Sequence, residues 1–534
     1  MSTVAGALAR AESELAGAPA GLVERVRDQA PGAAAAVLAR LWGAFARERL
    51  PLVASRGRAG GELVVRLSDG RTLRGPAAAA APFAVAGQGL TVWLDGEVFA
   101  DPAALLTEVC HGAGSVAAEL AGSVANLALG RAGAAAAPTW AELAAMAPAE
   151  ALVAAEQSVV DGHPLHPGCR FRGAMSAADV LAYGPEHRPM VALEVLEAPP
   201  GRWLSTGAGL PPRLLAHPWQ VARVLDRYPG VRRVGRQVVG RPLMSLRTLS
   251  LGAGRGHVKT SVSAQMTSAV RIVSPAAVHN GPVVSALLAR LAERTPGFAP
   301  MAESAAGAVL VDGAPCRELA MVLRDAPTLA PGEVAAPWAA LTARRPAGAA
   351  SLAGQLADVG YGGNVVALAA DLATTMLRPV VALLHAGVAL EAHGQNTLVV
   401  VRGGRPTRLL YRDTGGVRIS ARRLAAAGIA APPLHGDLAC EDPRELRTKV
   451  AAAVAVPLGE MVTVLAEHGQ VAPERLWAAV SASARDAFGR VPGSRDRVLL
   501  DGPLPVKATT AMRLAEDPLA DLWAWLPYGW DGTW

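Results

Sequence analysis

Apolar positions recur at helical spacing at both ends of the chain and alternate with polar positions in its middle. The helical spacing predicts two helices within residues 1–50 and further helices over 101–160 and 276–295. The alternation predicts a hairpin over 62–75, turning at Asp-Gly, and several strands between residues 230 and 272. Because helices and strands do not alternate one by one, the pattern predicts the α+β class with antiparallel sheets.

The second half of the chain carries the same kinds of signal. The segments GAVLVDG and CRELAMVLRD predict two strands around a Gly-Ala-Pro turn, and TLVVVRGGRPTRLLYRD predicts a hairpin that turns at Gly-Gly. A long helix is predicted over 363–392, and residues 420–534 are predicted to be mostly helical. The Gly-rich run 252–256 lacks the GxxxxGK[ST] spacing and lies between predicted strands, so we interpret it as a hairpin turn.

Composition and charge narrow the class of protein. The 534 residues are 51% hydrophobic and 18% charged, which excludes a disordered chain. The net charge of +6 is spread without a basic block, so nucleic acid is disfavoured and a small anionic substrate is favoured. The chain has 48 Arg and only three Lys, namely Lys259, Lys449 and Lys507, so a Lys is more informative here than usual.

The sequence predicts no membrane span. Its most apolar long stretch, 365–390, is interrupted by Asp371, Arg378 and His385. The first residues carry charges within an amphipathic helical pattern, unlike a signal peptide. The four cysteines are far apart and form no CxxC pair, so neither a zinc site nor a disulfide framework is expected. Together these features predict a soluble, cytoplasmic protein.

Three clusters of polar residues are candidates for chemistry. The first is GHPLHPGCRFR over 162–172, in which His163 and His166 are each followed by Pro and therefore lie on a stiffened loop. Three interpretations stay open: a metal site, a loop that presents His and Arg to an anion, and a purely structural loop.

The second cluster contains hydroxyl groups and cations on predicted strands. Ser245 and Arg247 are expected on one face of a strand, because side chains alternate with a period of two. A hairpin would bring Arg247 close to Lys259, and like charges on a half-buried sheet repel unless an anion lies between them. Thr248 and Arg271 add a hydroxyl and a cation, so the cluster predicts a polyphosphate site, with a solvated basic face as the alternative.

The third cluster is EAHGQN, followed by Asp413 at the end of the next hairpin. If the segment is extended, Glu391, His393 and Gln395 point to one side. Asn396 and Asp413 offer hard oxygen ligands of the kind that Mg²⁺ shares with nucleotide phosphates. The alternative is a polar corner whose groups satisfy one another.

These clusters occur in a fixed order together with AHPWQ, KTSVSAQMTSAVR and KATTAMRL, between residues 155 and 514. In this order the motifs resemble the IucA/IucC family, the aerobactin-synthetase-like family of siderophore synthetases that act independently of non-ribosomal peptide synthetases. The resemblance implies a cupped-hand fold with a thumb over 1–155, fingers over 156–335 and a palm over 336–534. It also implies a homodimer as one possible assembly.

The resemblance further implies a reaction. ATP would activate a carboxylate of citrate or a related acid as an acyl-adenylate, and an amine or hydroxyl would then form an amide or ester in siderophore biosynthesis. The catalytic residues implied are His393, Arg271 and Lys259. ATP would be bound by Ser245, Arg247, Thr248, Lys259, Gln395, Asn396 and Asp413, the acid by His163, His166, Thr267, Arg271 and His393, and Mg²⁺ by Glu391, Asn396 and Asp413.

The chain departs from the family pattern at Arg170, Ala174 and Ser268, where Lys, Gly and Gln are usual. These departures bear on the substrate more than on adenylation. Two alternatives remain beside the siderophore synthetase: the same ligation chemistry for another natural product, and a non-catalytic protein that binds iron or a siderophore. The family's C-terminal region resembles ferric reductase-like proteins, but Cys440 alone cannot hold an iron–sulfur cluster.

Overall fold

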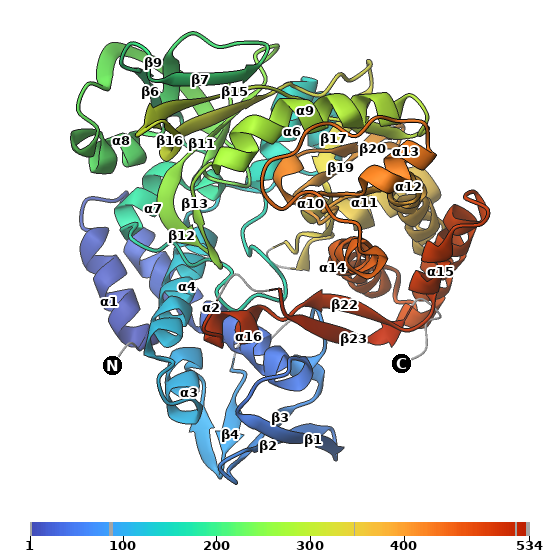
Figure 1. Cartoon of the computed structure of the whole chain (residues 1–534). Coiled ribbons are helices and arrows are strands. Elements are labelled where there is room, and N and C mark those ends of the chain that lie inside the picture. The colour runs from blue at the N-terminus through green and yellow to red at the C-terminus, as the bar shows by residue number, and fades with distance from the viewer. Residues whose placement is uncertain (1–2, 85–88, 346–347, 518–520, 530–534) are drawn as a thin grey trace.

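Figure 1 shows the computed structural model of the chain, which describes residues 3–84, 89–345, 348–517 and 521–529. Blocks of helices pack against sheets whose strands run antiparallel, so the predicted α+β class is confirmed. One pair departs from that pattern, because β14 and β20 run parallel.

The N-terminal region combines long helices with a five-stranded sheet. In α2 (Leu22–Arg47), Val26, Val37 and Leu41 recur on one face and are buried, and the helix packs against α4 (Gly114–Gly133). The remaining helices here are α1 (Val4–Glu14), α3 (Pro102–Val109), α5 (Trp140–Ala145) and α6 (Pro148–Gln157). The sheet runs in chain order through β1 (Val53–Ala59), β2 (Glu62–Leu67), β3 (Thr72–Pro76), β4 (Val92–Leu94) and β5 (Glu97–Phe99), so the hairpin predicted over 62–75 is confirmed.

An eight-stranded sheet forms the middle of the molecule, with strand order β7-β15-β16-β11-β10-β9-β6-β8. Side chains along β16 point alternately to the two faces of the sheet, and both faces are covered. Leu319 and Met321 belong to the core cluster that includes residues of α8. Ala320 and Val322 belong to the core cluster that includes residues of α9. The strands are β6 (Val191–Glu197), β7 (Trp203–Gly207), β8 (Arg213–Ala216), β9 (Arg232–Pro242), β10 (Thr248–Ser250), β11 (His257–Thr260), β15 (Glu303–Val311) and β16 (Ala314–Arg324). The helices are α7 (Ala177–Tyr183), α8 (Pro218–Val224) and α9 (Pro275–Ala292), and a separate hairpin joins β12 (Val262–Met266) to β13 (Ala269–Arg271).

The C-terminal half is a four-stranded sheet, in the order β14-β20-β19-β17, packed with helices. Its strands are β14 (Phe298–Pro300), β17 (Glu333–Pro337), β19 (Thr397–Arg402) and β20 (Arg405–Tyr411), so the hairpin predicted at Gly-Gly is confirmed. The helices are α10 (Trp338–Thr342), α11 (Leu352–Tyr361), α12 (Val365–Ala386), α13 (Ala421–Ala426), α14 (Pro443–Gly469) and α15 (Pro473–Gly489). A short ladder pairs β18 (Val388–Ala389) with β21 (Arg418–Ile419).

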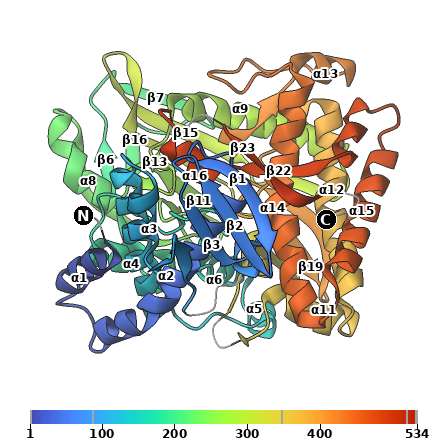
Figure 2. The same cartoon turned by 90° about the horizontal axis from the view of Figure 1, so that it is seen from below.

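The end of the chain returns to the N-terminal helices. The helix α16 (Thr509–Leu514) and the hairpin of β22 (Pro503–Lys507) and β23 (Trp523–Gly529) contact α2 (Figure 1), and Figure 2 shows this hairpin from below, beside α14. The buried carboxylate of Glu48 accepts hydrogen bonds from the backbone N–H groups of Thr510 (3.3 Å) and Ala511 (2.7 Å) at the start of α16. The two ends of the chain therefore hold each other in place.

Two local predictions were wrong. Residues 244–247 form a turn and not part of a strand, since the N–H of Thr248 donates to the carbonyl of Ser245 (2.8 Å), so Ser245 and Arg247 do not share a strand face. Residues 391–396 are not extended either, because the N–H of Asn396 donates to the carbonyl of His393 (2.9 Å) and closes a tight turn. In both places a turn within a polar segment overrides the alternation that the sequence suggested.

Two helices, Val365–Ala386 and Pro443–Gly469, are long and apolar enough to span a membrane. However, 56% and 72% of their most apolar windows are buried inside the protein, as expected for core helices. The three-region division predicted at 155/156 and 335/336 stays a prediction; β17 spans the second boundary.

A buried ion pair ties α6 to the end of β20. Arg412 Nη1 lies 2.5 Å from Glu156 Oε1, with side-chain exposures of 4% and 0%. Glu156 Oε2 also accepts the N–H of Met244 (3.0 Å), and Arg412 Nε donates to the carbonyl of Gln395 (3.0 Å). The Glu156–Arg412 pair therefore connects the N-terminal region with the turn at 244–247 and the turn at 391–396, which belong to the second and third polar clusters of the sequence.

We expect Glu156→Ala to lower the free energy of unfolding by about 3–5 kcal/mol, because it leaves the Arg412 guanidinium buried without a partner. Glu150→Ala is the matched control: Glu150 is on the same helix and pairs with Arg241 at 2.5 Å, but its side chain is 49% exposed. An exposed pair contributes only about 0–1 kcal/mol. Urea denaturation of both variants measures the difference, and equal midpoints would contradict the structural role given to Glu156.

Candidate active site

The predicted polyphosphate residues meet where β10 and β11 pair. Thr248 lies directly opposite Lys259 in the antiparallel register. The N–H and the hydroxyl of Thr260 both donate to the carbonyl of Arg247, at 2.8 and 3.0 Å, and fix the turn before β10. Arg247 Nη1 in turn donates to the carbonyl of Arg271 (3.1 Å), so the β12–β13 hairpin is tied to the same point.

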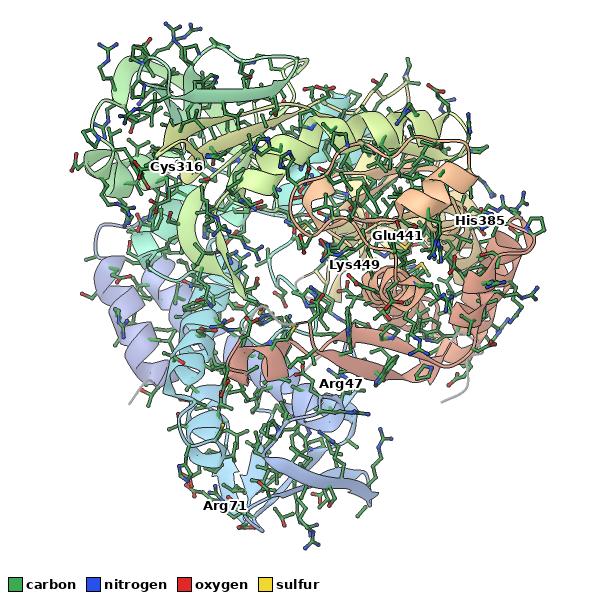
Figure 3. All side chains as sticks on the ribbon, viewed as in Figure 1. Arg47, Arg71, Cys316, His385, Glu441 and Lys449 are labelled. Atoms are coloured by element: carbon green, nitrogen blue, oxygen red, sulfur yellow. The ribbon has the colours of Figure 1, made fainter. Side chains whose placement is uncertain are left out.

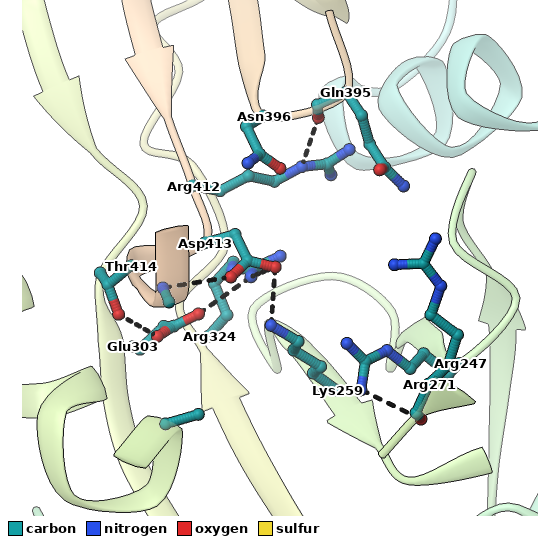
Figure 4. A network of polar contacts seen from close by, with 12 residues as sticks. Arg247, Lys259, Arg271, Glu303, Arg324, Gln395, Asn396, Arg412, Asp413 and Thr414 are labelled. Carbon is teal, nitrogen blue, oxygen red and sulfur yellow. Dashed lines mark hydrogen bonds and ion pairs between the residues drawn. The ribbon is translucent and has the colours of Figure 1, made fainter. Parts of the chain in front are cut away.

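The Lys259–Asp413 ion pair is the centre of the site. Lys259 Nζ lies 2.6 Å from Asp413 Oδ2, and Lys259 is only 7% exposed (Figure 4). Asp413 adopts the left-handed conformation (φ 72°) at the end of β20, and its carboxylate accepts the N–H of Gly415 (3.4 Å). The positive φ turns the chain away from the sheet and presents the carboxylate to Lys259.

A second, buried pair supports the first. Arg324 Nη2 lies 3.0 Å from Glu303 Oε1 and 3.9 Å from Asp413 Oδ2. The hydroxyl of Thr414 donates to the other oxygen of Glu303 (2.6 Å). Figure 4 shows these side chains facing Lys259 and Arg247 from the opposite strands. Strands β11, β15, β16 and the end of β20 thus all contribute to one network.

The network carries more positive than negative charge. Burial lowers the pKa of Arg247 to about 10 and also lowers that of Lys259, with Asp413 opposing both shifts. Burial raises the pKa of Asp413, but Lys259 and Arg324 outweigh it and hold the pKa far below its usual range. In the described part of the chain, neither Arg247 nor Arg271 has a carboxylate within ion-pair distance. Four cations (Arg247, Lys259, Arg271, Arg324) therefore share two carboxylates (Asp413, Glu303), an imbalance that an anionic ligand would correct.

The turn at 391–396 forms another wall of the site. Glu391 Oε1 pairs with Lys449 Nζ at 2.9 Å, and the same carboxylate leaves no room for a Cβ at Gly416. Asn396 Nδ2 donates to the carbonyl of Glu391 (3.4 Å). Burial raises the pKa of Glu391, but Lys449 and His393 outweigh it, so the group is a carboxylate at neutral pH.

Four histidines share one local geometry. In each, the backbone N–H two residues further along donates to Nδ1, so a neutral ring carries its proton on Nε2. The pairs are His163 with Leu165 (3.2 Å), His166 with Gly168 (2.9 Å), His217 with Trp219 (3.2 Å) and His393 with Gln395 (3.3 Å). Three of these histidines precede Pro, and His163 and His166 lie on a loop as expected for 162–172, where backbone N–H groups hold their Nδ1 atoms.

Burial keeps these rings neutral. It lowers the pKa of His163, His166 and His217 to about 3 each. It also lowers the pKa of His393, although the charges of Glu391 and Asp413 oppose the shift. The side chain of His163 is exposed, and Arg40, His393 and Lys507 are its electrostatic neighbours. The site thus presents neutral N–H donors on Nε2.

The β12–β13 hairpin brings the predicted acid-binding residues together. Arg271 Nη2 donates to Thr267 Oγ1 (2.6 Å) and to the carbonyl of Met266 (2.8 Å). Thr267 has a positive φ of 58°, and the hydroxyl of the next residue, Ser268, lies 2.7 Å from His166 Nε2. The departure from the family pattern at Ser268 therefore supplies the partner of His166.

Two parts of the chain match models of known protein families. Residues 151–208 and 213–343 match the model of the IucA / IucC family, and that match contains both the His-Pro loop and the paired strands with Arg247 and Lys259. This part of the chain is similar to the IucA/IucC family. Residues 367–520 match a second model, described as ferric iron reductase FhuF-like transporter.

Individual proteins and solved structures are also similar to the chain. Staphyloferrin A synthase of Staphylococcus aureus is 26% identical over 315 residues, covering 51% of this chain and 54% of that protein. The chain thus matches about half the length of that relative. The petrobactin biosynthesis protein AsbB of Bacillus anthracis superposes with a TM-score of 0.78 at 18% identity, covering 95% and 98% of the two chains. ATP-bound aerobactin synthetase IucA of Klebsiella pneumoniae gives 0.74 at 21% identity, covering 90% and 97%. The IucA/IucC fold therefore extends over nearly the whole chain.

The structure brings most of the predicted site residues together. Lys259 contacts Asp413, Arg247 contacts Arg271, and Thr267 contacts Arg271. Glu391 and Asp413, predicted as joint metal ligands, are each paired with a lysine instead. Ser245 and Thr248 close the turn at 244–247 through a backbone hydrogen bond. The carbonyl of Gln395 accepts a hydrogen bond from Arg412, and the side-chain amide of Asn396 donates one to the carbonyl of Glu391.

Several residues of the site had no clear signal in the sequence. Glu303 and Arg324 lie on strands with no motif around them, and only folding places them beside Asp413. Arg172 is 9% exposed and donates only to the carbonyl of Phe171 (3.1 Å), with no carboxylate partner in the described ranges. Burial lowers the pKa of Arg172, and Arg170 and Arg271 lower it further. Lys449 and Lys507 differ from these residues, because the scarcity of lysine in the sequence had already marked them as informative.

Proposed function

We propose that the chain is an ATP-dependent synthetase of siderophore biosynthesis, which activates a carboxylate as an acyl-adenylate and joins it to an amine or hydroxyl. The observation that carries the proposal is the excess of buried cations around Lys259 and Asp413. Relatives named staphyloferrin A synthase, D-ornithine–citrate ligase and rhizobactin siderophore biosynthesis protein RhbC, together with the ATP-bound structural neighbour, support the same chemistry. A cytoplasmic location and a citrate-like acid are parts of this proposal.

The cations would bind the phosphates of ATP. Lys259 would exchange its partner Asp413 for a phosphate oxygen, because a lysine ammonium is a point charge that pairs with either. Arg247 has no acid to give up and offers N–H groups directly. Ser245, Thr248 and Gln395 would complete the nucleotide site.

The exchange of Asp413 for a phosphate oxygen at Lys259 also bears on whether Mg²⁺ can bind at this site. Glu391, Asn396 and Asp413 supply the oxygen donors that Mg²⁺ prefers, but no group of three or more His, Cys, Asp or Glu in the described residues could hold a metal alone. If a phosphate replaced Asp413 beside Lys259, Asp413 would keep Arg324 at 3.9 Å and could offer an oxygen to Mg²⁺ together with Glu391 and Asn396. When bound there, Mg²⁺ would neutralise phosphate charge.

The acid would lie between the His-Pro loop and the β12–β13 hairpin. Arg271, Arg172 and Thr267 offer donors to a carboxylate, and His163 and His166 add neutral N–H groups. In the first step a carboxylate oxygen forms a bond to the α-phosphorus, and the bond from that phosphorus to pyrophosphate breaks. Pyrophosphate leaves with the electron pair.

In the second step the amine or hydroxyl attacks the acyl carbon, AMP leaves with the electron pair of the broken C–O bond, and the nucleophile loses a proton. His393 is suited to stabilise negative charge in both steps, first on the carboxylate that attacks the α-phosphorus and then on the acyl oxygen, because its Nδ1 accepts the N–H of Gln395 and its Nε2 carries the proton. This tautomer makes His393 a donor and not a general base.

We expect Arg247→Ala and Lys259→Ala each to lower kcat/KM for ATP by about 10- to 100-fold, since a charge-assisted bond to phosphate contributes roughly 1.5–3 kcal/mol. Arg236→Ala is the matched control, because Arg236 is exposed on β9 of the same sheet. Pyrophosphate release at varied ATP concentration measures the effect. If both variants keep the ATP dependence of the control, the phosphate assignment is wrong.

For His393→Ala we expect normal folding, normal ATP binding and a loss of roughly 10²–10⁴-fold in pyrophosphate release. His393→Gln retains an N–H donor and should recover part of that loss. The measurement is ATP–pyrophosphate exchange over a panel of carboxylates, with hydroxylamine to trap the activated acid. An unstable variant with intact specific activity would show that His393 only supports the turn.

A further inference from the structure

The tip of the β12–β13 hairpin carries a serine that has no role in the proposed function. Ser268 is the second residue of the two-residue turn between Met266 and Ala269, and it is partly exposed. Its hydroxyl oxygen lies 2.7 Å from Nε2 of His166, whose side chain is buried. A side-chain hydrogen bond therefore joins the hairpin tip to the His-Pro loop.

The direction of this hydrogen bond is fixed by the other nitrogen of the ring. The backbone N–H of Gly168 donates to His166 Nδ1 (2.9 Å), so Nδ1 carries no proton. Burial lowers the pKa of His166 to about 3, which keeps the ring neutral at pH 7 and leaves its one proton on Nε2. Nε2–H is therefore the donor, and the hydroxyl oxygen of Ser268 is the acceptor.

The hydroxyl proton of Ser268 is consequently available to another acceptor. A hydroxyl group accepts and donates at the same time, and its proton rotates toward the acceptor that is offered. Among the residues that the structure describes, His166 is the only hydrogen-bond partner of this side chain. The chain of hydrogen bonds from Gly168 through His166 thus ends on an O–H donor at the edge of the site.

The turn that carries Ser268 is held in one conformation. Thr267 has a φ of 58°, which a β-branched residue rarely adopts. Arg271 Nη2 donates to the hydroxyl of Thr267 (2.6 Å), and Gln265 Nε2 donates to its carbonyl (3.1 Å). Backbone strain of this kind persists where the surrounding contacts enforce it, as at ligand sites. These contacts keep the Ser268 hydroxyl beside the histidine.

Ser268 lies at the end of the acid site that is remote from the phosphates. The open end of the hairpin is at Arg271, whose carbonyl accepts Arg247 Nη1 (3.1 Å) from the phosphate cluster. The other end of the hairpin extends toward α4 (Figure 1) and meets the His-Pro loop, where Arg172 pairs with Met266. Because the guanidinium of Arg172 has no carboxylate partner in the described ranges, a ligand carboxylate fits between it and Ser268.

We propose that Ser268 contacts the acid and determines its specificity, and that His166 is a positioning residue that acts through Ser268. The inference rests on the proposed function and adds a residue to its acid site. The Ser268 hydroxyl donates to a second carboxylate of the acid, not to the carboxylate that reacts. His166 occupies a lone pair of the hydroxyl oxygen and so directs the O–H proton toward the substrate. The serine replaces the usual glutamine, so this chain recognises its acid with a shorter side chain.

The test measures hydroxamate formation with ATP, hydroxylamine and whichever acid of a panel of di- and tricarboxylates reacts fastest. Ser268→Ala is expected to raise KM for that acid by about ten- to hundredfold, as for a lost hydrogen bond to a charged group, with little change in kcat or in KM for ATP. Ser268→Thr keeps the hydroxyl and should recover most of the loss. His166→Phe should raise KM for the acid similarly, and His166→Gln, which keeps an N–H donor, should recover part of it.

A double variant shows whether His166 acts through Ser268. Both substitutions remove the same directed donor, so Ser268→Ala combined with His166→Phe should raise KM no further than either alone. Ser263→Ala is the matched control, because Ser263 is on the same hairpin but its hydroxyl donates to Glu318 Oε1 (3.0 Å). Glu318 lies on β16 two residues from Cys316, which Figure 3 shows near α8 and away from the acid site.

The inference is overturned if Ser268→Ala keeps the KM for the acid of the Ser263→Ala control, and this variant alone decides if His166→Phe does not fold. It is also overturned if the two effects multiply in the double variant. Equal rises in KM for the acid and for ATP would overturn it as well, because they would show that the turn only supports the fold. If the wild type forms no hydroxamate with any acid, the proposed function itself is contradicted.

Discussion

The site depends on one electrostatic constraint: more positive charge is buried where the two large sheets meet than the local carboxylates can neutralise. Lys259 and Arg324 share Asp413, Glu303 pairs with Arg324, and Arg247 pairs with no acid among the residues that the structure describes. Burying unpaired charge is costly, so such a cluster persists only if the surrounding fold is strong enough to hold it. The two core clusters on either face of β16 provide that support.

The constraint explains how the parts of the chain are joined. Asp413 reaches Lys259 because the chain turns through a positive φ at the end of β20, and Arg412 next to it is anchored to Glu156 in the N-terminal region. The histidine loop contributes donors without adding charge, since its Nε2–H tautomer is fixed by backbone N–H groups. In the function that we propose, the cations around Lys259 would face the phosphates, and the neutral histidines together with Arg271 and Arg172 would face the acid.

The sequence predicted the parts of this site that depend on local patterns. The Asp-Gly and Gly-Gly hairpins, the turn at 252–256 and the His-Pro loop were all found, because each is determined by neighbouring residues. The turn at 244–247 was missed, because alternation of apolar residues looks the same in a strand and in the turn before it. The motif residues came from the family resemblance, which covers most of the chain.

The rest could not be predicted from one sequence, because it depends on contacts between distant segments. Lys259 and Asp413 are 154 positions apart, and Lys449 and Glu391 are 58 apart. Nothing near Glu303 or Arg324 marks them as neighbours of Asp413. The rarity of lysine pointed to Lys449 and Lys507, but only the fold shows that both are electrostatic neighbours of His393.

The central claim is that the acid is activated on the α-phosphorus of ATP. The most direct measurement uses a carboxylate labelled with ¹⁸O, together with ATP and a nucleophile, and follows the label by mass spectrometry. The account predicts that one ¹⁸O atom appears in AMP for each product molecule formed. Label in inorganic phosphate, with ADP as the nucleotide product, would show attack on the γ-phosphorus and contradict the account.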